Sequence, residues 1–331
     1  MQSIKNENKE KMLALFRTMV RIREFEETAA KLFLEGKLVG FLHLYSGEEA
    51  VATGVCSCLR NDDCVTSTHR GHGHCIAKGA DVNRMMAELF GKVDGYSKGK
   101  GGSMHIADIS KGIIGANGIV GAGIPIAVGV AYAQKYREQD AVTVSFFGDA
   151  ASNRGTFHES LNMAATLNLP VVFVCENNQF GMSTPFSYHS KNKTISQRAA
   201  AYDMPGVRVN GNDPVAVRDA ALEAVVRARE GSGPSLIECI TWRHHGHFIG
   251  DSAPYKNPSD EKLWREKDPI PNFEQRLIGD GLADVSELEQ IKADAIDEMQ
   301  RSVRYAQQSP FPETDVMYED LFFEGAEKCP E

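Results

Sequence analysis

Two strand-like stretches of the sequence end in polar side chains that could hold a metal ion. The apolar run "AVTVSFF" (141–147) leads into Gly148 and Asp149. The run "LPVVFVCE" (169–176) leads into a pair of asparagines, the second of which is Asn178. Each could be structural alone, because Asp often caps a helix and Asn-Asn often forms a turn. Together they predict a hard oxygen site suited to Mg²⁺ or Ca²⁺.

The residues that follow Asp149 are small, which favours an anion as the second occupant of this site. Ala150, Ala151 and Ser152 would let backbone N–H groups approach an anion where the next helix begins, and the helix dipole favours negative charge there. Mg²⁺ usually shares its ligand shell with phosphate oxygens of a bound molecule. The combined prediction is a metal-bridged diphosphate.

The elements that must position these residues alternate along the chain. From residue 141 onward, strands that are apolar throughout alternate with helical patterns, which predicts a mainly parallel sheet with helices on both faces. In such a sheet, ligands bind outside the carboxyl ends of the strands. We therefore expect a doubly wound α/β fold forming a single domain over 1–331. It would carry a helical N-terminal extension (1–40) and a helical C-terminal region (262–331).

Helical periodicity near the N-terminus marks residues 7–35 and 46–59. Ser46 is expected to cap the second of these helices, with Glu49 at the distance of a capping box. Farther along, the glycine-rich stretch 91–121 shows no clear periodicity, and so long an irregular segment in a compact domain is usually functional.

Composition excludes several classes of function. The chain has 331 residues and a net charge of −9, which argues against nucleic acid or an anionic membrane as the main partner. No run approaches 18 apolar residues, and the N-terminus does not resemble a signal peptide. The seven cysteines are odd in number and form no CxxC pair, which favours free thiols and a cytoplasmic location.

The histidine-rich stretches "HRGHGH" and "HHGHF" invite comparison with zinc sites. No cysteine pair accompanies them at the spacing of a zinc finger, so a structural zinc site is not expected. Both stretches lie in polar loops, where a parallel sheet places its active site. We therefore expect at least one of these histidines to serve catalysis, since imidazole exchanges its proton near neutral pH.

The pattern from Gly148-Asp149 to Asn178 resembles the thiamine-diphosphate motif. Nearly the whole chain is similar to the α subunit of the E1 component of 2-oxo-acid and acetoin dehydrogenases. Six further stretches occur in family order: "THRGHGH" (68–74), "GKGGSMH" (99–105), "GANGIVGAGIP" (115–125), "FHESLNMAA" (157–165), "CENNQFGM" (175–182) and "HHGHF" (244–248).

The resemblance implies a cofactor site built on thiamine diphosphate and Mg²⁺. Its metal ligands would be Asp149, Asn178 and the backbone carbonyl of Phe180. The residues implied for cofactor binding are His69, Arg70, Gly118, Val120, Gly148, Asp149, Ala150, Ala151 and Asn178. One of these departs from the family pattern: Ala150 stands where the motif usually has glycine. Either the backbone there is right-handed, or the phosphate lies slightly farther away.

The resemblance also implies the catalytic residues. His247 corresponds to the histidine of the catalytic loop, and His43 and His72 are weaker candidates expected to line the same cavity. Members of the family that act on pyruvate and are regulated by phosphorylation carry serine directly after that histidine. This chain has Phe248 there, so we expect that device to be absent or displaced.

The family further implies partners and a reaction. A separate β subunit would supply the glutamate that activates the cofactor, giving an α2β2 heterotetramer that serves the lipoyl domain of an E2 partner. Stretches 68–91 and 244–251 look closest to acetoin dehydrogenase α subunits. The expected enzyme is therefore an oxidoreductase that cleaves acetoin, releases acetaldehyde and passes a two-carbon unit to lipoamide. Pyruvate is the alternative substrate, and branched-chain 2-oxo acids rank last.

Two other classes of function remain open at this point. A Rossmann oxidoreductase is suggested by Gly121 and Gly123, which begin a G-x-G pattern. That signal is weak because Ile126 replaces the third glycine and no strand immediately precedes the pattern. A non-enzymatic binding role would be favoured if Asp149 and Asn178 lay far apart.

Overall fold

The computed structural model describes residues 2–320, and the last eleven residues of the predicted C-terminal helical region lie outside them. Its main sheet has six strands in the order β2-β1-β3-β4-β8-β7, all parallel to their neighbours. The strands are β1 (Cys64–Thr66), β2 (Ile113–Gly115), β3 (Thr143–Gly148), β4 (Val171–Asn177), β7 (Gly206–Asn210) and β8 (Ser235–Ile240). A small antiparallel pair, β5 (Phe180–Gly181) and β6 (Thr184–Pro185), follows β4.

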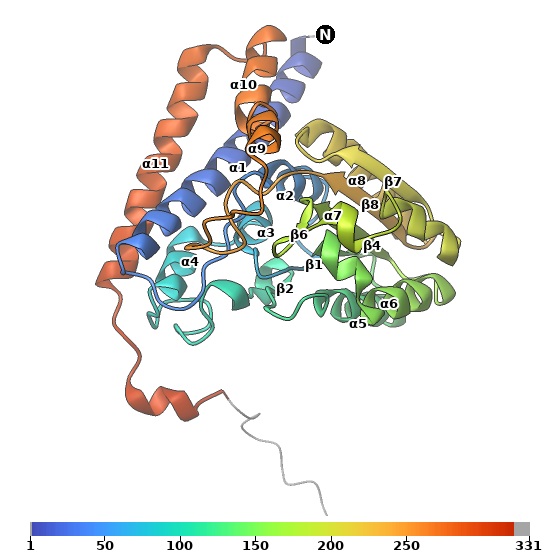
Figure 1. Ribbon diagram of the computed structural model, residues 1–331, viewed down its shortest axis with the longest axis horizontal. Coiled ribbons are helices and arrows are strands. Elements are labelled where there is room, and N and C mark those ends of the chain that lie inside the picture. The colour runs from blue at the N-terminus through green and yellow to red at the C-terminus, as the bar shows by residue number, and fades with distance from the viewer. Residues whose placement is uncertain (1, 321–331) are drawn as a thin grey trace, which may run out of the picture.

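Helices surround this sheet, as Figure 1 shows. The α-helices are α1 (Gln2–Leu34), α2 (Glu49–Cys56), α3 (His72–Ala77), α4 (Val82–Leu89), α5 (Gly123–Tyr136), α6 (Gly155–Thr166), α7 (Phe186–His189), α8 (Pro214–Arg229), α9 (Pro258–Arg265), α10 (Pro269–Gly279) and α11 (Val285–Gln308). Short 3-10 helices are η1 (Ser103–His105), η2 (Ile109–Lys111), η3 (Asp149–Asn153), η4 (Ser196–Tyr202) and η5 (Thr314–Tyr318). In the described part of the chain, no helix is both long and apolar enough to span a bilayer.

Alternating side chains of β3 show why the strands are apolar throughout. Val144 and Phe146 pack in a core with α2, α3, α4 and α8, whereas Phe147 packs in a second core with α5 and α6. Successive side chains of a strand point to opposite faces, so a strand in a sheet covered on both faces is buried on both sides and is mostly apolar. The two polar side chains of β3, Thr143 and Ser145, are also buried. The predicted doubly wound α/β fold is confirmed.

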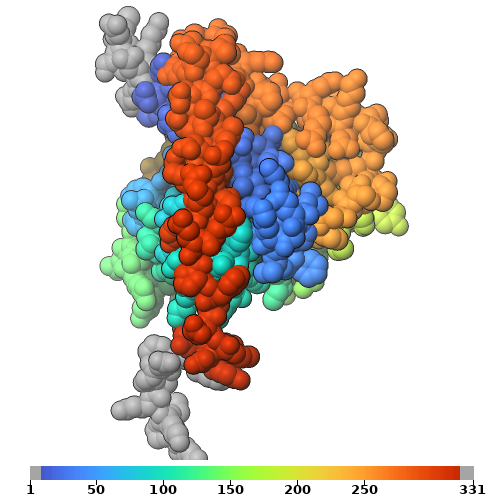
Figure 2. Space-filling view, turned by 90° about the vertical axis from the view of Figure 1, so that its left-hand side faces the viewer, coloured from blue at the N-terminus to red at the C-terminus, as the bar shows by residue number. Residues whose placement is uncertain are grey.

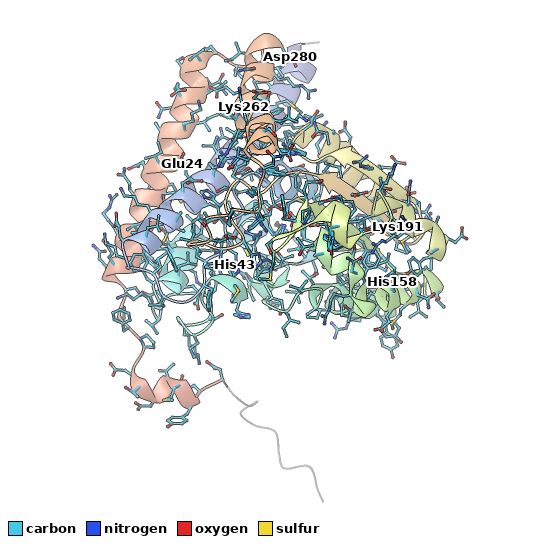
Figure 3. All side chains as sticks on the ribbon, viewed as in Figure 1. Glu24, His43, His158, Lys191, Lys262 and Asp280 are labelled. Carbon is cyan, nitrogen blue, oxygen red and sulfur yellow. The ribbon has the colours of Figure 1, made fainter. Side chains whose placement is uncertain are left out.

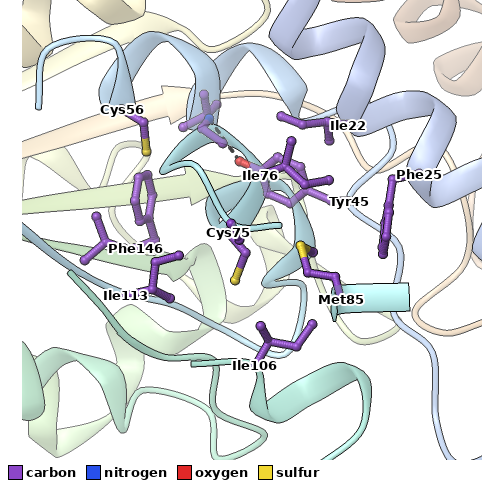
Figure 4. Packing of buried hydrophobic residues seen from close by; sticks show 14 of the residues in the cluster. Ile22, Phe25, Tyr45, Cys56, Cys75, Ile76, Met85, Ile106, Ile113 and Phe146 are labelled. Carbon is purple, nitrogen blue, oxygen red and sulfur yellow. Dashed lines mark hydrogen bonds between the residues drawn. The ribbon is translucent and has the colours of Figure 1, made fainter. Parts of the chain in front are cut away.

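The first core reaches the N-terminal extension. Ile22 and Phe25 of α1 are fully buried against side chains from α2, α3 and α4, and Figure 4 shows them converging with Tyr45 and Met85. The first half of α1 forms a third core with α10 and α11. Figure 2 shows α11 running along the surface beside α1. The N-terminal and C-terminal helices thus brace the outside of one face of the sheet.

The order of the strands places a switch point between β1 and β3. From β1 the chain moves outward to β2, then returns to the other side of β1 to form β3 and β4. Loops that leave two neighbouring strands in opposite directions open a crevice at their carboxyl ends, where open α/β sheets bind ligands. The loops after β1, β3 and β4 are therefore the elements that shape a site.

Candidate active site

A cavity of about 410 Å³ lies at the carboxyl ends of β1, β3 and β4. Thr68 follows β1, Asp149 follows β3 and Asn178 follows β4, and all three side chains line it. This volume is within the range of small-molecule sites in proteins. The two strand ends singled out in the sequence therefore meet at one cavity. A non-enzymatic role was favoured only if Asp149 and Asn178 lay far apart, and they do not.

The expected metal ligands surround one side of this cavity. Asp149 begins η3 and is almost fully buried, and Asn178 and Phe180 line the cavity beside it. A carboxylate, an amide oxygen and a backbone carbonyl are hard oxygen donors, and three of them leave room for phosphate oxygens in an octahedral shell. Among residues 2–320, no group of three or more His, Cys, Asp or Glu side chains could hold a metal ion by itself. The donor set therefore fits Mg²⁺ shared with a bound diphosphate.

The turn after β3 accommodates alanine without strain. Ala150 lies within η3 and its φ is not positive, so the backbone has no need for glycine there. Its methyl group faces Gly181, where an added Cβ would lie only 2.6 Å from the Cβ of Ala150. Of the two alternatives considered for this position, the backbone geometry supports the right-handed one. Gly181 supplies the space that the alanine needs.

Most of the residues implied for cofactor binding line the cavity. They are His69, Arg70, Val120, Gly148, Asp149, Ala150, Ala151 and Asn178. Gly118 does not reach the wall and lies beside Met104 and His105, although Val120 of the same segment does reach it. The segment does meet the cavity, because Asn117 and Ile119, on either side of this glycine, also line it.

Arg70 is buried and links the loop after β1 to the loop that carries His247. Its Nη1 donates to the carbonyl of Leu44 at 2.7 Å, and its Nη2 donates to the carbonyl of His247 at 2.5 Å. The same Nη2 lies 3.3 Å from Nδ1 of His247. Burial and the neighbouring Arg243 lower the pKa of Arg70 to about 10, so its guanidinium remains charged at neutral pH.

Three histidines cluster around this arginine. The ring of His43 lies 4.9 Å from that of His69 and 5.0 Å from that of His247, and Figure 3 shows His43 near the centre of the molecule. Burial and the charge of Arg70 lower the pKa of His43 to about 3 and that of His247 to about 4. All three imidazoles are therefore neutral at neutral pH, since burial also holds the pKa of His69 well below its usual value.

His72 does not line the cavity, so its expected place at the cavity wall is wrong. It is fully buried at the start of α3. Its Nδ1 lies 3.1 Å from a carboxylate oxygen of Glu26, and its Nε2 lies 2.9 Å from the hydroxyl of Ser103. Because both ring nitrogens are engaged, His72 ties α1 to the glycine-rich segment. His43 also lies behind the lining residues and meets the site through its ring contacts with His69 and His247.

Internal hydrogen bonds fix the loop that carries His247. One carboxylate oxygen of Asp251 accepts from the backbone N–H of His247 at 2.6 Å and from the hydroxyl of Tyr255 at 2.7 Å. The ammonium of Lys256 donates to the carbonyls of Arg243 and His245 at 2.6 and 2.7 Å. The loop therefore presents His247 to the cavity from a formed scaffold.

Two buried glutamates that the sequence did not predict lie beside the expected metal ligands. Glu48 lines the cavity, and its Oε1 accepts from the side-chain amide of Asn178 at 3.0 Å. Burial and the charge of Glu176 raise the pKa of Glu48 to about 8, which favours its protonated form at neutral pH. Glu176 in turn accepts hydrogen bonds from Tyr45 and, at 2.9 Å, from His74. In the sequence, Glu48 could have been noticed because it and Glu49 are adjacent acidic residues that directly precede an apolar helical stretch.

The predicted helix cap near Glu48 is wrong. Ser46 does not cap α2, because its hydroxyl donates to Glu27 of α1 at 2.9 Å. Helix α2 begins at Glu49, whose carboxylate accepts from the backbone N–H of Gly47. The contact with α1 thus replaces the local capping box and leaves Glu48 directed toward Asn178.

A doubly wound parallel sheet with a cavity at its switch point is typical of α/β proteins that bind phosphate-containing ligands. The dehydrogenase E1 component family model matches residues 17–315, and the chain belongs to this family. Membership confirms the resemblance seen in the sequence. It implies thiamine diphosphate as the cofactor of an oxidoreductase and a β subunit as partner of this α-type chain.

Relatives named for different activities match almost the full length of the chain. The α subunit of acetoin:2,6-dichlorophenolindophenol oxidoreductase from Bacillus subtilis is 52% identical over 95% of this chain and 94% of its own. The subunit of the same name from Cupriavidus necator is 45% identical over 95% of both chains. The pyruvate dehydrogenase E1 component α subunit of Rhizobium meliloti is 42% identical over 95% of this chain and 90% of its own.

Proposed function

We propose that this chain is the α subunit of an E1 component that cleaves acetoin with Mg²⁺ and thiamine diphosphate. Acetaldehyde would be released, and the remaining two-carbon unit would pass to lipoamide on the lipoyl domain of an E2 partner. The observation that carries the proposal is the meeting of Asp149, Asn178 and Phe180 at one cavity that His69 and His247 also line. The choice of acetoin is supported by the 52% and 45% identity to the two acetoin-oxidising relatives.

In this proposal, Asp149, Asn178 and the carbonyl of Phe180 hold the metal, and Arg70 contributes positive charge next to the diphosphate. The small side chains of Ala150 and Ala151 leave room for the diphosphate at the start of η3. When bound, the cofactor supplies a nucleophilic carbon and an electron sink for cleavage of the C–C bond. The glutamate that activates the cofactor would come from the β subunit.

The protonation of His247 follows from its contact with Arg70. A guanidinium can only donate, so Nδ1 of His247 accepts from Nη2 and carries no proton. Because the ring is neutral at neutral pH, its proton resides on Nε2. His247 can therefore donate a hydrogen bond from Nε2–H to a substrate oxygen on which negative charge develops, which is the role we assign to it.

Pyruvate is the second candidate substrate, favoured by the 42% identity to a pyruvate dehydrogenase α subunit. Turnover decides between the two. The α chain is produced with its β subunit, and reduction of 2,6-dichlorophenolindophenol is followed with acetoin and then with pyruvate, each with and without Mg²⁺ and thiamine diphosphate. We expect kcat/KM to be higher for acetoin. A higher value for pyruvate would overturn the substrate assignment and leave the cofactor assignment in place.

The assembly and location are part of the same proposal. We expect an α2β2 heterotetramer with the cofactor at the α–β interface, which sedimentation of the co-produced subunits tests. A cytoplasmic location is supported by the cysteines, because all six in the described part of the chain are unpaired. Mn²⁺ or Ca²⁺ in place of Mg²⁺ in the turnover assay determines how strictly the hard-oxygen site selects its cation.

A further inference from the structure

The carboxylate of Asp149 has a partner that no motif in the sequence indicated. Nε2 of His189 lies 2.9 Å from Oδ2 of Asp149, and both side chains line the cavity. His189 is the last residue of α7, forty residues farther along the chain, and its side chain is only 14% exposed. The family motif accounts for Asp149 and leaves this histidine without a role.

A chain of hydrogen bonds fixes which nitrogen of His189 carries the proton. Nη2 of Arg198 lies 2.9 Å from Oδ1 of Asn153, and a guanidinium can only donate. The amide of Asn153 therefore turns its Nδ2 toward His189, where it donates to Nδ1 at 2.9 Å and to the backbone carbonyl at 3.1 Å. Since Nδ1 accepts, Nε2 carries the proton and donates it to Asp149.

Arg198 anchors this chain of bonds to both segments. Its Nη1 donates to the carbonyl of Ser152 and, at 3.1 Å, to the hydroxyl of the same residue in η3. Its Nη2 also donates to the hydroxyl of Ser190 at 3.1 Å, next to His189. The segment that begins with Asp149 and the segment that ends α7 are thereby cross-linked, and the position of the imidazole does not depend on the metal.

We propose that His189 is a positioning residue for the metal-binding carboxylate. Its Nε2–H holds Oδ2 of Asp149, so that Oδ1 is directed toward the cation before the cation arrives. The inference rests on the metal site of the proposed function. Hydrogen-bond partners of metal-ligating side chains typically contribute about 10- to 100-fold to metal affinity.

The test measures Mn²⁺ binding by electron paramagnetic resonance in the α–β complex with thiamine diphosphate, with Mn²⁺ standing in for Mg²⁺. In His189→Gln, the side-chain amide nitrogen occupies nearly the place of Nε2 and still donates. In His189→Asn, the side chain is too short to reach Asp149 but can still contact Asn153. We expect His189→Gln to bind Mn²⁺ within about threefold of wild type and His189→Asn to bind about 10- to 100-fold more weakly.

A matched control is His158→Gln. His158 is an exposed residue of α6 that contacts Tyr202, and Figure 3 shows it well apart from His43 at the site. We expect this variant to bind Mn²⁺ as wild type does. Thermal unfolding without cofactor distinguishes a local effect from misfolding, because a positioning role predicts that the Gln and Asn variants both keep a single cooperative unfolding transition.

Asp149→Ala separates failure of this inference from failure of the proposed function. If Asp149→Ala abolishes Mn²⁺ binding while His189→Asn binds as wild type, the role of His189 is refuted and the metal site stands. Equal weakening in the Gln and Asn variants also refutes the role, since it would show that the hydrogen bond is not what matters. If wild type itself binds no Mn²⁺, or Asp149→Ala binds it unchanged, the metal site and the inference fall together.

Discussion

The close approach of Ala150 and Gly181 makes the proposed metal site sensitive to a single methyl group. Ala150 follows Asp149, and Gly181 follows Phe180. The contact between these two small residues therefore sets how closely the two proposed metal-binding segments approach each other. An added Cβ at Gly181 would lie 2.6 Å from the Cβ of Ala150. The φ of Gly181 is not positive, so Gly181→Ala acts through this contact and not through backbone strain.

The size of the effect follows from the overlap. Two carbon atoms in contact prefer a separation of about 3.5–4.0 Å, so one strand end must move by about 1 Å. Overpacking of this kind typically costs about 1–3 kcal/mol. If the shift is taken up between Asp149 and Phe180, the affinity for Mg²⁺ with thiamine diphosphate falls about 5- to 150-fold, at about 1.4 kcal/mol for each factor of ten.

The assay is titration of the α–β complex with thiamine diphosphate at fixed Mg²⁺, followed by quenching of protein fluorescence. Ala150→Gly alone should bind at least as well as wild type, because it only removes a methyl group that faces the cavity. Ala150→Gly combined with Gly181→Ala should recover most of the lost affinity, with a coupling energy of about 1–3 kcal/mol. Unchanged binding in Gly181→Ala, or no recovery in the double variant, would show that the contact between these two residues does not control cofactor affinity.

Two further predictions concern the histidine cluster. Replacing His247 by Gln should lower kcat about 10²- to 10⁴-fold while cofactor affinity stays within threefold, as measured by steady-state turnover and fluorescence titration; an unchanged kcat would remove His247 from the catalytic residues. Burial lowers the pKa of His247 to about 4 and that of His43 to about 3, whereas a histidine in the unfolded chain has a pKa of about 6.5. Below pH 6.5 these two histidines therefore bind more protons in the unfolded chain than in the folded one. The free energy of unfolding should therefore be constant above pH 6.5 and fall as the pH drops toward 4, more steeply in wild type than in His247→Gln. Urea denaturation of the α–β complex at several pH values checks this, and parallel curves for the two proteins would contradict it.

The strands that could be predicted from sequence are the ones buried on both faces. β3, β4 and β8 read as continuous apolar runs because helices cover both sides of them. β7 (Gly206–Asn210) gave no such signal, since it is an edge strand whose residues are mostly exposed. β2 (Ile113–Gly115) lies within the glycine-rich segment, where three residues are too few to establish a period.

The residues of the candidate site also fall into those that could be predicted from sequence and those that could not. Asp149 and Asn178 could be predicted because each directly follows a buried strand, and the rule for parallel sheets then brings them together. His189 and Glu48 could not, because they are placed by contacts between segments 40 and 130 residues apart. The expected position of His72 was wrong for the same reason. Its ring contacts Glu26 and Ser103, which come from other segments, and it does not line the cavity.

The most direct test of the central claim is a crystal structure of the α–β complex with Mg²⁺ and thiamine diphosphate. We expect a metal ion about 2.1 Å from a carboxylate oxygen of Asp149, the amide oxygen of Asn178 and the carbonyl oxygen of Phe180, with diphosphate oxygens completing the shell. A metal bound elsewhere, or a diphosphate outside the cavity at the ends of β3 and β4, would contradict it.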